Sequence, residues 1–341
     1  MEIRGTLTAD SVLGDEDRLA RWSHLAWTCF EALDRAWTPA VAEVRTEMVG
    51  LVRAVAVGAR LKEPDLATGR VEWFRRLARS RGWTGGRSDR ILDCLRKSCP
   101  EPDWLEVLPE RLAPESKEDP TGAVELDGAA AGFHECLRDG DRHGAMRQVE
   151  SLLDRGMTVR EIFLDVFLPS QREFGRLWEL GEISVAEEHF ATAATQFAMS
   201  TMYQRMFSGK RTGRRVLVAC APGELHEIGT RMAADLFELD GWDSVYLGSD
   251  NSSSRLRGEL RSHSPHLVVL GCTLVESIPA LEGLLRTSLR TNPEIPVMVG
   301  GPPFNRAPGL WARLGAGAMA PSLEEALHLG LELVQGRSVT P

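Results

Sequence analysis

The chain has 341 residues and a formal net charge of −9 at pH 7, and 43% of its residues are hydrophobic. This length is expected to form two or three domains with packed cores, and the acidic balance argues against general nucleic-acid binding. No apolar run approaches membrane-spanning length and the first residues lack a secretion signal, so we expect a cytoplasmic protein without membrane contact. The six cysteines show no zinc-finger spacing and are expected to be reduced thiols.

The first 113 residues are predicted to form a helical domain, because apolar side chains recur there at helical spacing. This domain either packs its tryptophans as a small core, which is the more common arrangement, or uses them to surround a flat aromatic ligand. Residues 114–123 are polar and bounded by prolines, which is typical of a linker. Six of the nine tryptophans lie in the first 113 residues: Trp22, Trp27, Trp37, Trp73, Trp83 and Trp104.

Residues 124–208 are predicted to form an antiparallel four-helix bundle, because short loops join four segments with helical periodicity. Capping boxes are expected to open the third helix at Thr158 and the fourth at Ser184. Pro169 is expected to kink or break the third helix. The fourth helix is expected to continue to about residue 207.

Residues 213–337 alternate between short apolar runs and helical segments, which predicts a doubly wound α/β domain with a five-stranded parallel sheet. We expect a flavodoxin-like (Rossmann-type) strand order, with the switch point between the first and third strands. A last helix is expected at 322–335. The predicted strands are 215–220, 243–247, 266–271, 295–299 and, weakly, 317–320.

His226 lies in the turn between the first strand and the following helix, at the sheet edge where α/β domains bind ligands. A neutral imidazole can bind a metal through one nitrogen while the other donates to a carboxylate such as Glu224. A lone histidine on a loop is more often a plain surface residue, so this pattern alone is weak. The turn lacks Gly-x-Gly-x-x-Gly and Gly-Lys-Ser/Thr, which disfavours phosphate binding.

The run Glu224-Leu-His226-Glu-Ile-Gly229, followed by Gly271-Cys272-Thr273 and by Gly300-Gly301, is similar to the cobalamin-binding motif. The resemblance implies that His226 binds cobalt from below, in place of the dimethylbenzimidazole base. It also implies a slot for the base and its nucleotide tail, lined by Thr273, Gly300 and Gly301. Gly271 stands where the family often has serine, which leaves Thr273 to supply the hydroxyl.

A second motif lies in the predicted bundle: Trp178, Gly181, Val185, Glu188 and His189 resemble the Trp…Gly…Val…Glu-His signature of light-sensing adenosylcobalamin proteins of the CarH/LitR type. The resemblance implies that Trp178 covers the adenosyl group and that Glu188 accepts a hydrogen bond from its ribose. The alternative is that Glu188 and His189 are solvated charges on a helix.

One position departs from the light sensors: Glu179 stands where they have a histidine that takes the upper cobalt position after illumination. Water, His189 or His143 are the alternatives for that position.

The resemblance does not extend to residues 1–113, where no helix-turn-helix with a basic wing is evident, so direct DNA binding is not expected. Helical, tryptophan-rich domains fused to such sensors resemble photocobilins, which bind biliverdin as well as cobalamin. The alternatives are a structural dimerisation module and a solvated arginine face. The residues considered for the bilin are Arg75, Arg76, Arg79 and Arg81, which could neutralise its propionates, and His24, the domain's only histidine.

The sequence therefore favours a light sensor, not an enzyme, in which loss of the adenosyl group changes conformation and self-association. The downstream partner is not identified. A corrinoid methyl carrier serving a methyltransferase is the alternative from another class. A mutase subunit is disfavoured, because the sequence contains no substrate barrel.

Overall fold

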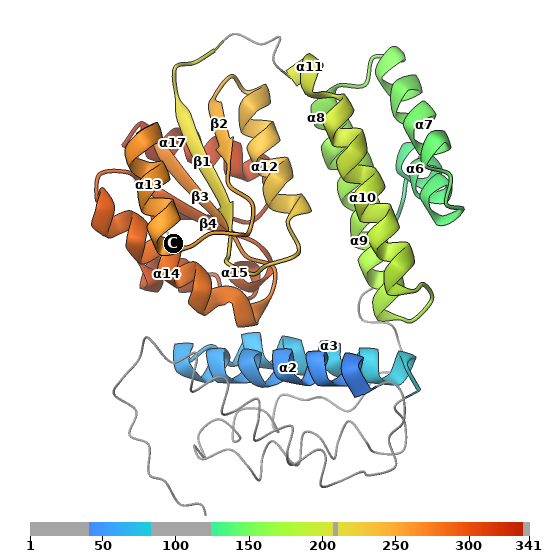
Figure 1. Ribbon diagram of the computed structural model, residues 1–341, viewed down its shortest axis with the longest axis horizontal. Helices are drawn as coiled ribbons and strands as arrows, with labels where there is room; N and C mark the ends of the chain where they lie inside the picture. Colours follow the sequence, from blue (N-terminus) through green and yellow to red (C-terminus); the bar gives the residue numbers. More distant parts are fainter. Residues whose placement is uncertain (1–40, 83–123, 207–210, 337–341) are drawn as a thin grey trace, which may run out of the picture. The chain divides into compact units, whose positions relative to one another are not determined.

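The structure is a computed structural model that describes residues 41–82, 124–206 and 211–336 (Figure 1). The predictions for residues 1–40 and 83–123 lie outside the described residues. These include His24, the linker and the N-terminal tryptophans other than Trp73. None of the described helices is both long and apolar enough to cross a membrane.

The N-terminal region contains α2 (Val41–Leu61) and α3 (Pro64–Ser80), drawn in blue in Figure 1. Arg70 of α3 forms an ion pair with Glu47 of α2 at 3.1 Å, and its guanidinium lies 3.9 Å from the centroid of the Trp73 ring. The helical prediction for this region is thus confirmed over these two elements. Trp73 packs against an arginine of its own helix.

Residues 124–206 form a helical segment around aromatic side chains. The rings of Phe133 and Phe167 lie 4.9 Å apart, and those of Phe163 and Phe167 lie 5.8 Å apart. All three phenylalanines are fully buried, and they belong to a hydrophobic cluster that continues into the sheet domain at Met232 and Phe237. The elements are α6 (Gly128–Arg138), α7 (Arg142–Asp154), α8 (Val159–Glu161), η1 (Ile162–Phe167), α9 (Leu168–Glu179), α10 (Val185–Thr201) and α11 (Tyr203–Met206).

Pro169 does not break the third predicted helix, because the chain passes from α8 through the π-helix η1 into α9. The amide of Leu168 donates to the carbonyl of Phe163, five residues earlier. A π-helical stretch changes the hydrogen-bond partners just before the proline, which has no amide hydrogen to donate. The expected break is therefore replaced by a local widening of the helix.

Both predicted capping boxes are confirmed. The Thr158 hydroxyl accepts from the Glu161 amide, and the Glu161 carboxylate accepts from the Thr158 amide at 2.7 Å. Ser184 and Glu187 make the same pair of bonds at the start of α10. The predicted end of the fourth helix is wrong: α10 ends at Thr201, whose hydroxyl donates to a carbonyl of the preceding turn, and the short α11 follows.

Residues 211–336 form a parallel five-stranded sheet in the order β2-β1-β3-β4-β5, which confirms the flavodoxin-like prediction. The strands β1, β3 and β4 are almost entirely buried, as expected for a sheet covered by helices on both faces, whereas the edge strand β2 is partly exposed. The strands are β1 (Arg215–Cys220), β2 (Asp243–Tyr246), β3 (Leu267–Gly271), β4 (Val297–Gly300) and β5 (Ala318–Ala320). The helices are α12 (Ile228–Leu239), α13 (Ser253–His263), η2 (Val275–Ser277), α14 (Ile278–Thr291), α15 (Pro302–Arg306), α16 (Leu310–Leu314) and α17 (Leu323–Val334).

Polar groups along α12 add to the apolar contact between the helical segment and the sheet domain. The Tyr203 hydroxyl donates to Asp235 Oδ1 at 3.3 Å, and Arg231 donates to the Ser200 hydroxyl at 2.9 Å. Arg160 of α8 forms an ion pair with Asp240, which caps the end of α12. Asp235 is the unusual member, because it is buried and its Oδ2 has no hydrogen-bond partner among the described residues.

Asp235 makes the stability of the protein depend on pH. Burial raises the pKa of its carboxyl to about 6, against the opposing effects of the Arg231 charge and the Tyr203 hydroxyl. Between about pH 4 and pH 6 the folded state therefore binds more protons than the unfolded state, so stability falls as the pH rises. Above about pH 6 the charged Asp235 carboxylate lowers the stability of the folded state by the full amount, on the order of 2 kcal/mol.

Asp235→Asn is expected to stabilise the protein by on the order of 1–2 kcal/mol at pH 8 and by almost nothing at pH 4. The amide carries no charge and keeps an oxygen for the Tyr203 hydroxyl. Urea denaturation of both proteins at the two pH values measures the difference. An equal stability change at pH 4 and pH 8 would contradict the assignment.

Candidate functional site

His226 lies in the loop between β1 and α12, at the carboxyl edge of the sheet. Its side chain is 56% exposed, whereas the Glu224 side chain beside it is 1% exposed. Nδ1 of His226 lies 2.5 Å from Oε1 of Glu224, which confirms the predicted contact. Because an ionised carboxylate only accepts hydrogen bonds, Nδ1 is the donor and the lone pair of Nε2 remains available to a metal.

Glu224 joins the loop after β1 to the loop after β3. Its Oε2 accepts from the amides of Thr273 at 3.2 Å and Leu274 at 3.0 Å, and its Oε1 also accepts from the His226 amide. Burial by itself would raise the pKa of this carboxyl, but the hydrogen bonds from His226 and the backbone amides lower it to about 2. Glu224 is therefore an ionised acceptor at any ordinary pH.

The hydrogen bond that His226 donates to Glu224 also raises the pKa of His226, and the negative charges of Glu224, Glu188 and Glu276 add to the effect. Glu188 belongs to α10, so the helical segment contributes charge to the surroundings of His226. The field around the imidazole is thus negative, which favours a positively charged ligand such as a metal ion.

A second carboxylate, Glu227, anchors the loop that carries His226 on its other side. It was not among the predicted site residues. Tyr246 donates its hydroxyl to Oε2 of Glu227 at 3.1 Å, and the Ser249 hydroxyl donates to Oε1. Burial, followed by the nearby Cys220 and Glu227, raises the pKa of Tyr246, so its phenol stays a donor. The carboxylate next to His226 is visible in the sequence, but its partners lie about twenty residues further on.

The glycines at the strand ends are required by close packing within the protein. Gly301 has a φ of +117°, and a Cβ there would lie 1.9 Å from the Cys272 carbonyl oxygen. A Cβ on Gly271 would lie 2.0 Å from the Thr230 hydroxyl. The register pairs Gly271 with Gly300, so these backbones meet at one edge.

Thr273 was predicted to supply the hydroxyl that a serine at position 271 would carry. In the structure the Thr230 hydroxyl fills the space that a side chain at Gly271 would occupy. Thr273 contributes its backbone amide to Glu224. Gly229, in the first turn of α12, has no atom within 4 Å of the place of a Cβ. The surface beside His226 is therefore open at that position.

The helical segment carries a second imidazole–carboxylate pair. Nδ1 of His189 lies 2.5 Å from Oε2 of Glu188, and Thr192 donates its hydroxyl to Oε1 of Glu188 at 2.9 Å. The Thr192 hydroxyl oxygen also lies 2.9 Å from Gln171 Oε1 of α9, and its single proton serves one of these two acceptors at a time. The Glu188 side chain is 27% exposed and that of His189 is 72% exposed.

One face of α10 points to the sheet domain. Ser200 contacts Arg231 of α12, and Val185, His189, Thr192 and Gln196 precede it at steps of three or four residues. Val185 is exposed on this face. Of the predicted residues of α10, Val185 and His189 therefore lie on the side of the helix that carries the contact with α12.

The predicted site residues thus fall into two sets. Trp178 lies near the end of α9, seven residues after Gln171 and so on the same helix face, and it is half-buried against the core. The α10 set is Val185, Glu188 and His189, and the set at the sheet edge is Glu224, His226, Gly229, Thr273, Gly300 and Gly301.

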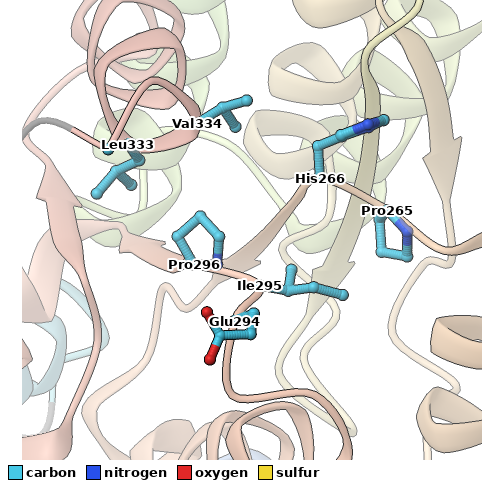
Figure 2. Close-up of a pocket in the computed structure, with 8 residues that line it drawn as sticks. Pro265, His266, Glu294, Ile295, Pro296, Leu333 and Val334 are labelled. Atoms are coloured by element: carbon cyan, nitrogen blue, oxygen red, sulfur yellow. The ribbon is translucent and has the colours of Figure 1, made fainter.

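A cavity of about 340 Å³ lies at the opposite, amino edge of the sheet (Figure 2). His266 precedes β3, and its Nδ1 accepts from the Arg215 amide at 3.0 Å. That histidine therefore satisfies the backbone of the sheet. The cavity is remote from His226 along the strands and is not part of the candidate site. Its lining includes Pro265, His266, Glu294, Ile295, Pro296 and Leu333.

Within the described ranges, no group of three or more His, Cys, Asp or Glu side chains is arranged to hold a metal ion. His226 is a single donor whose second nitrogen is held by a carboxylate. Such a donor suits a metal whose other positions are filled by a macrocycle, as for the axial ligands of haem.

Comparison with known proteins agrees with this chemistry. Two models described as B12 binding domains match residues 129–203 and 214–328. The HTH-type transcriptional repressor CarA of Myxococcus xanthus is 30% identical over 157 residues, which are 45% of this chain and 52% of CarA. The chain thus spans about half the length of CarA.

Monomethylamine corrinoid protein 1 of Methanosarcina acetivorans is 23% identical over 203 residues, which cover 56% of this chain and 91% of that protein. The solved monomethylamine corrinoid protein of Methanosarcina barkeri has the same fold, with a TM-score of 0.53 at 20% identity, over 59% of this chain and 96% of that one. Residues 129–328 are therefore a B12-binding region, and the protein is a cobalamin-binding protein.

Proposed function

We propose that this protein is a light sensor, not an enzyme, that holds adenosylcobalamin between the His226 loop and α10. The observation that carries the proposal is the Glu188 carboxylate. Its side chain is 27% exposed, the Thr192 hydroxyl donates to it, and its negative charge is among those that raise the pKa of His226. A carboxylate that a bound ligand covers is stabilised by a hydroxyl that donates to it, and the ribose of an adenosyl group carries such hydroxyls.

The residues present fit a cobalamin. His226 offers Nε2 to the cobalt, with Glu224 holding its other nitrogen. Large apolar side chains exposed among the described residues include Val185 on α10 and Leu225 next to His226, and these suit the faces of a corrin. Bound adenosylcobalamin would supply a cobalt–carbon bond that light breaks.

The side chains around the adenosyl group have distinct tasks in this proposal. Trp178 and Val185 cover its apolar surface and exclude water. Glu188 accepts from the ribose, since each of its oxygens keeps a free lone pair beside the bonds to Thr192 and His189. When the adenosyl group is lost, these side chains lose their partner and α10 can repack.

The contacts between the helical segment and α12 suit a change of arrangement. They include two hydrogen bonds, Tyr203 to Asp235 and Arg231 to Ser200, and the ion pair of Arg160 with Asp240. Polar contacts of this kind exchange readily for water, so a small change at α10 can shift the balance between two docked arrangements. We propose that the shift alters self-association in a cytoplasmic protein that reaches its downstream partner without binding DNA directly.

The test is illumination of the protein loaded with adenosylcobalamin in the dark. The absorbance spectrum and the elution volume are both expected to change on exposure to light. Protein loaded with hydroxocobalamin, which lacks the adenosyl group, is the control and is expected to show neither change. Unchanged absorbance and unchanged elution of the adenosylcobalamin form would reject the proposal.

A corrinoid methyl carrier is the second candidate, favoured by the 91% coverage of the methylamine corrinoid protein. It would share His226 but would have no use for a ribose acceptor. Under the sensor proposal, Glu188→Gln is expected to weaken adenosylcobalamin binding about tenfold and leave methylcobalamin binding unchanged. Titration of both cobalamins against both proteins measures this. An equal loss for the two cobalamins would favour the carrier.

The N-terminal region is proposed to bind biliverdin as a second chromophore. Arg75 and Arg76 of α3 are half-buried and Arg79 is exposed, so cationic groups border the surface of this helix. Arg81 follows the helix. Retained, red-shifted absorbance after addition of biliverdin and gel filtration supports the proposal, and its absence favours a structural role for the region.

A further inference from the structure

We propose that Ser249 and Tyr246 are positioning residues for the metal ligand: they hold Glu227 and so fix the loop that presents His226 to the cobalt. The inference rests on the proposed function, in which His226 is that ligand, and it names residues that keep the ligand in place. The juxtaposition that carries it is a loop attached to both neighbouring strands of β1, with His226 between the two attachments.

The loop between β1 and α12 has an acidic side chain on each side of His226. Glu224, two residues earlier, accepts from two backbone amides that follow β3. Glu227, the next residue, accepts from the hydroxyls of Tyr246 in β2 and Ser249 in the loop after β2. Because β2 and β3 are the two neighbours of β1 in the sheet, the loop is held from both sides. The first attachment orients the imidazole directly, whereas the second acts on it through the backbone.

The side chain of Glu227 stabilises the loop and not the start of the helix. Glu227 is the N-cap residue of α12, yet its side chain makes no capping hydrogen bond. A polar side chain at this position commonly accepts from an amide of the first turn, where the helix dipole also favours a carboxylate. Glu227 instead accepts from Tyr246 at 3.1 Å and from Ser249, while its backbone carbonyl accepts from the Arg231 amide at 2.9 Å.

Ser249 holds both ends of the loop. Its hydroxyl donates to Glu227 at the end of the loop, and its backbone carbonyl accepts from the Gly223 amide, near the start, at 3.2 Å. Gly223 has a φ of +77°, so the chain turns there in a conformation that favours glycine. A single residue of the neighbouring loop therefore fixes the span of chain that carries His226.

Tyr246 attaches Glu227 to the sheet itself. It lies in β2, in register with Val218 of β1, and its phenol oxygen is 3.5 Å from Sγ of the buried Cys220. The position of the phenol is thus set by strand pairing and by packing against β1. The carboxylate next to His226 is held by one donor from a strand and one from a loop.

These attachments change the free energy of presenting Nε2 of His226 to a metal. Ordering the backbone of a loop residue costs about 1–2 kcal/mol, and a loop that is ordered in advance does not lose this free energy on binding. Groups that support a metal ligand commonly change metal affinity by about 10–100-fold. Cobalamin also carries a base of its own, so a less ordered loop shifts the balance from His226 toward that base.

The first experiment measures amide deuterium uptake of the full chain without cobalamin. Ser249→Ala and Tyr246→Phe each remove one hydroxyl and are expected to speed uptake across residues 223–228, with the strands unchanged. Ser249→Thr keeps a hydroxyl and is expected to exchange as the wild type does. Ser254→Ala is the matched control, because Ser254 is an exposed serine of α13 whose hydroxyl lies 2.9 Å from that of Ser252.

The second experiment loads the same proteins in the dark with cobalamin reduced to cobalt(II), after their histidines have been labelled with heavy nitrogen. Electron paramagnetic resonance then distinguishes the labelled imidazole from the unlabelled base, because the two nitrogen isotopes split the cobalt signal differently. The wild type is expected to show the labelled imidazole. Ser249→Ala and Tyr246→Phe are expected to bind cobalamin about tenfold more weakly and to show the unlabelled base in a fraction of the molecules.

For this second experiment, Ser249→Thr and Ser254→Ala are expected to give the wild-type signal and affinity. Unchanged loop exchange or an unchanged imidazole signal in Ser249→Ala would overturn the inference, as would weaker cobalamin binding without faster exchange in the loop. Urea denaturation establishes that each variant is folded, and Tyr246→Phe is judged by the same criteria if Ser249→Ala is not.

Two further outcomes separate the inference from the proposed function. A wild type without a signal from the labelled imidazole would remove His226 as the metal ligand, and this inference with it. Failure of the adenosylcobalamin protein to respond to light would remove the sensor proposal and leave the expected exchange and resonance results unchanged.

Discussion

His226→Ala is expected to lose cobalamin on gel filtration, with an affinity at least about 100-fold below that of the wild type. The variant removes the imidazole that Glu224 orients and whose Nε2 is the proposed donor to the cobalt. Cobalamin that remains bound is expected to carry its own base on the metal and to show the corresponding spectrum. Equilibrium titration and absorbance spectroscopy measure both effects.

The fold is expected to tolerate this change. Glu224 keeps the amide hydrogen bonds from Thr273 and Leu274, so its charge is not left without partners. His266→Ala is the matched control, because His266 lies at the opposite edge of the sheet (Figure 2). It is expected to retain cobalamin. A His226→Ala protein that binds cobalamin with the wild-type spectrum would refute the assignment of the metal ligand.

Gly301→Ala is expected to lower the free energy of unfolding by about 3 kcal/mol or more. Its φ of +117° is unfavourable for any residue with a Cβ, and that Cβ would lie 1.9 Å from the Cys272 carbonyl oxygen. The β4 end must move away from the β3 loop to relieve the overlap. Cobalamin binding is expected to fall with it, since the same loop holds Glu224 through Thr273.

Gly283→Ala is the control for this variant. Gly283 lies within α14 and has no atom within 4 Å of the place of a Cβ. Alanine is there expected to stabilise the protein by about 0.5–1 kcal/mol. Urea denaturation of both variants gives the two changes. If the free energy of unfolding of Gly301→Ala were within about 0.5 kcal/mol of the wild-type value, the tight contact between Gly301 and Cys272 would be wrong.

The strands and their order were predictable, because a sheet covered by helices on both faces is built from uninterrupted apolar runs. The run Val216 to Ala219 is apolar without interruption, and helical periodicity follows it. The capping boxes at Thr158 and Ser184 were equally visible, since their partners lie three residues away. Local patterns of this kind decide local structure.

The response to Pro169 was not predictable in the same way. A proline within a helix has several outcomes, and which one occurs depends on the packing of the turn before it. Here Phe163 and Phe167 are buried on either side of the widened turn. The premature end of α10 at Thr201 likewise follows from a hydroxyl–carbonyl bond that competes with the helix.

Within the site, the predictable contact is the one between neighbours in sequence, Glu224 and His226. The partners of Glu227 come from β2 and the loop after it, and the Thr230 hydroxyl meets Gly271 only through the pairing of β1 with β3. The Glu188–His189 contact runs against helical geometry, so no spacing rule indicates it. Sequence therefore located the two halves of the site but not the network that orients each half.

The two amides bound by Glu224 have a further consequence. Thr273 and Leu274 donate to the same carboxylate that holds the imidazole of His226, so any pull on that ring reaches their hydrogen bonds. Their deuterium uptake, followed by mass spectrometry or NMR, would slow when the histidine is engaged and quicken when it is released. Exchange at these two amides would therefore report whether His226 binds a metal, without a measurement of absorbance.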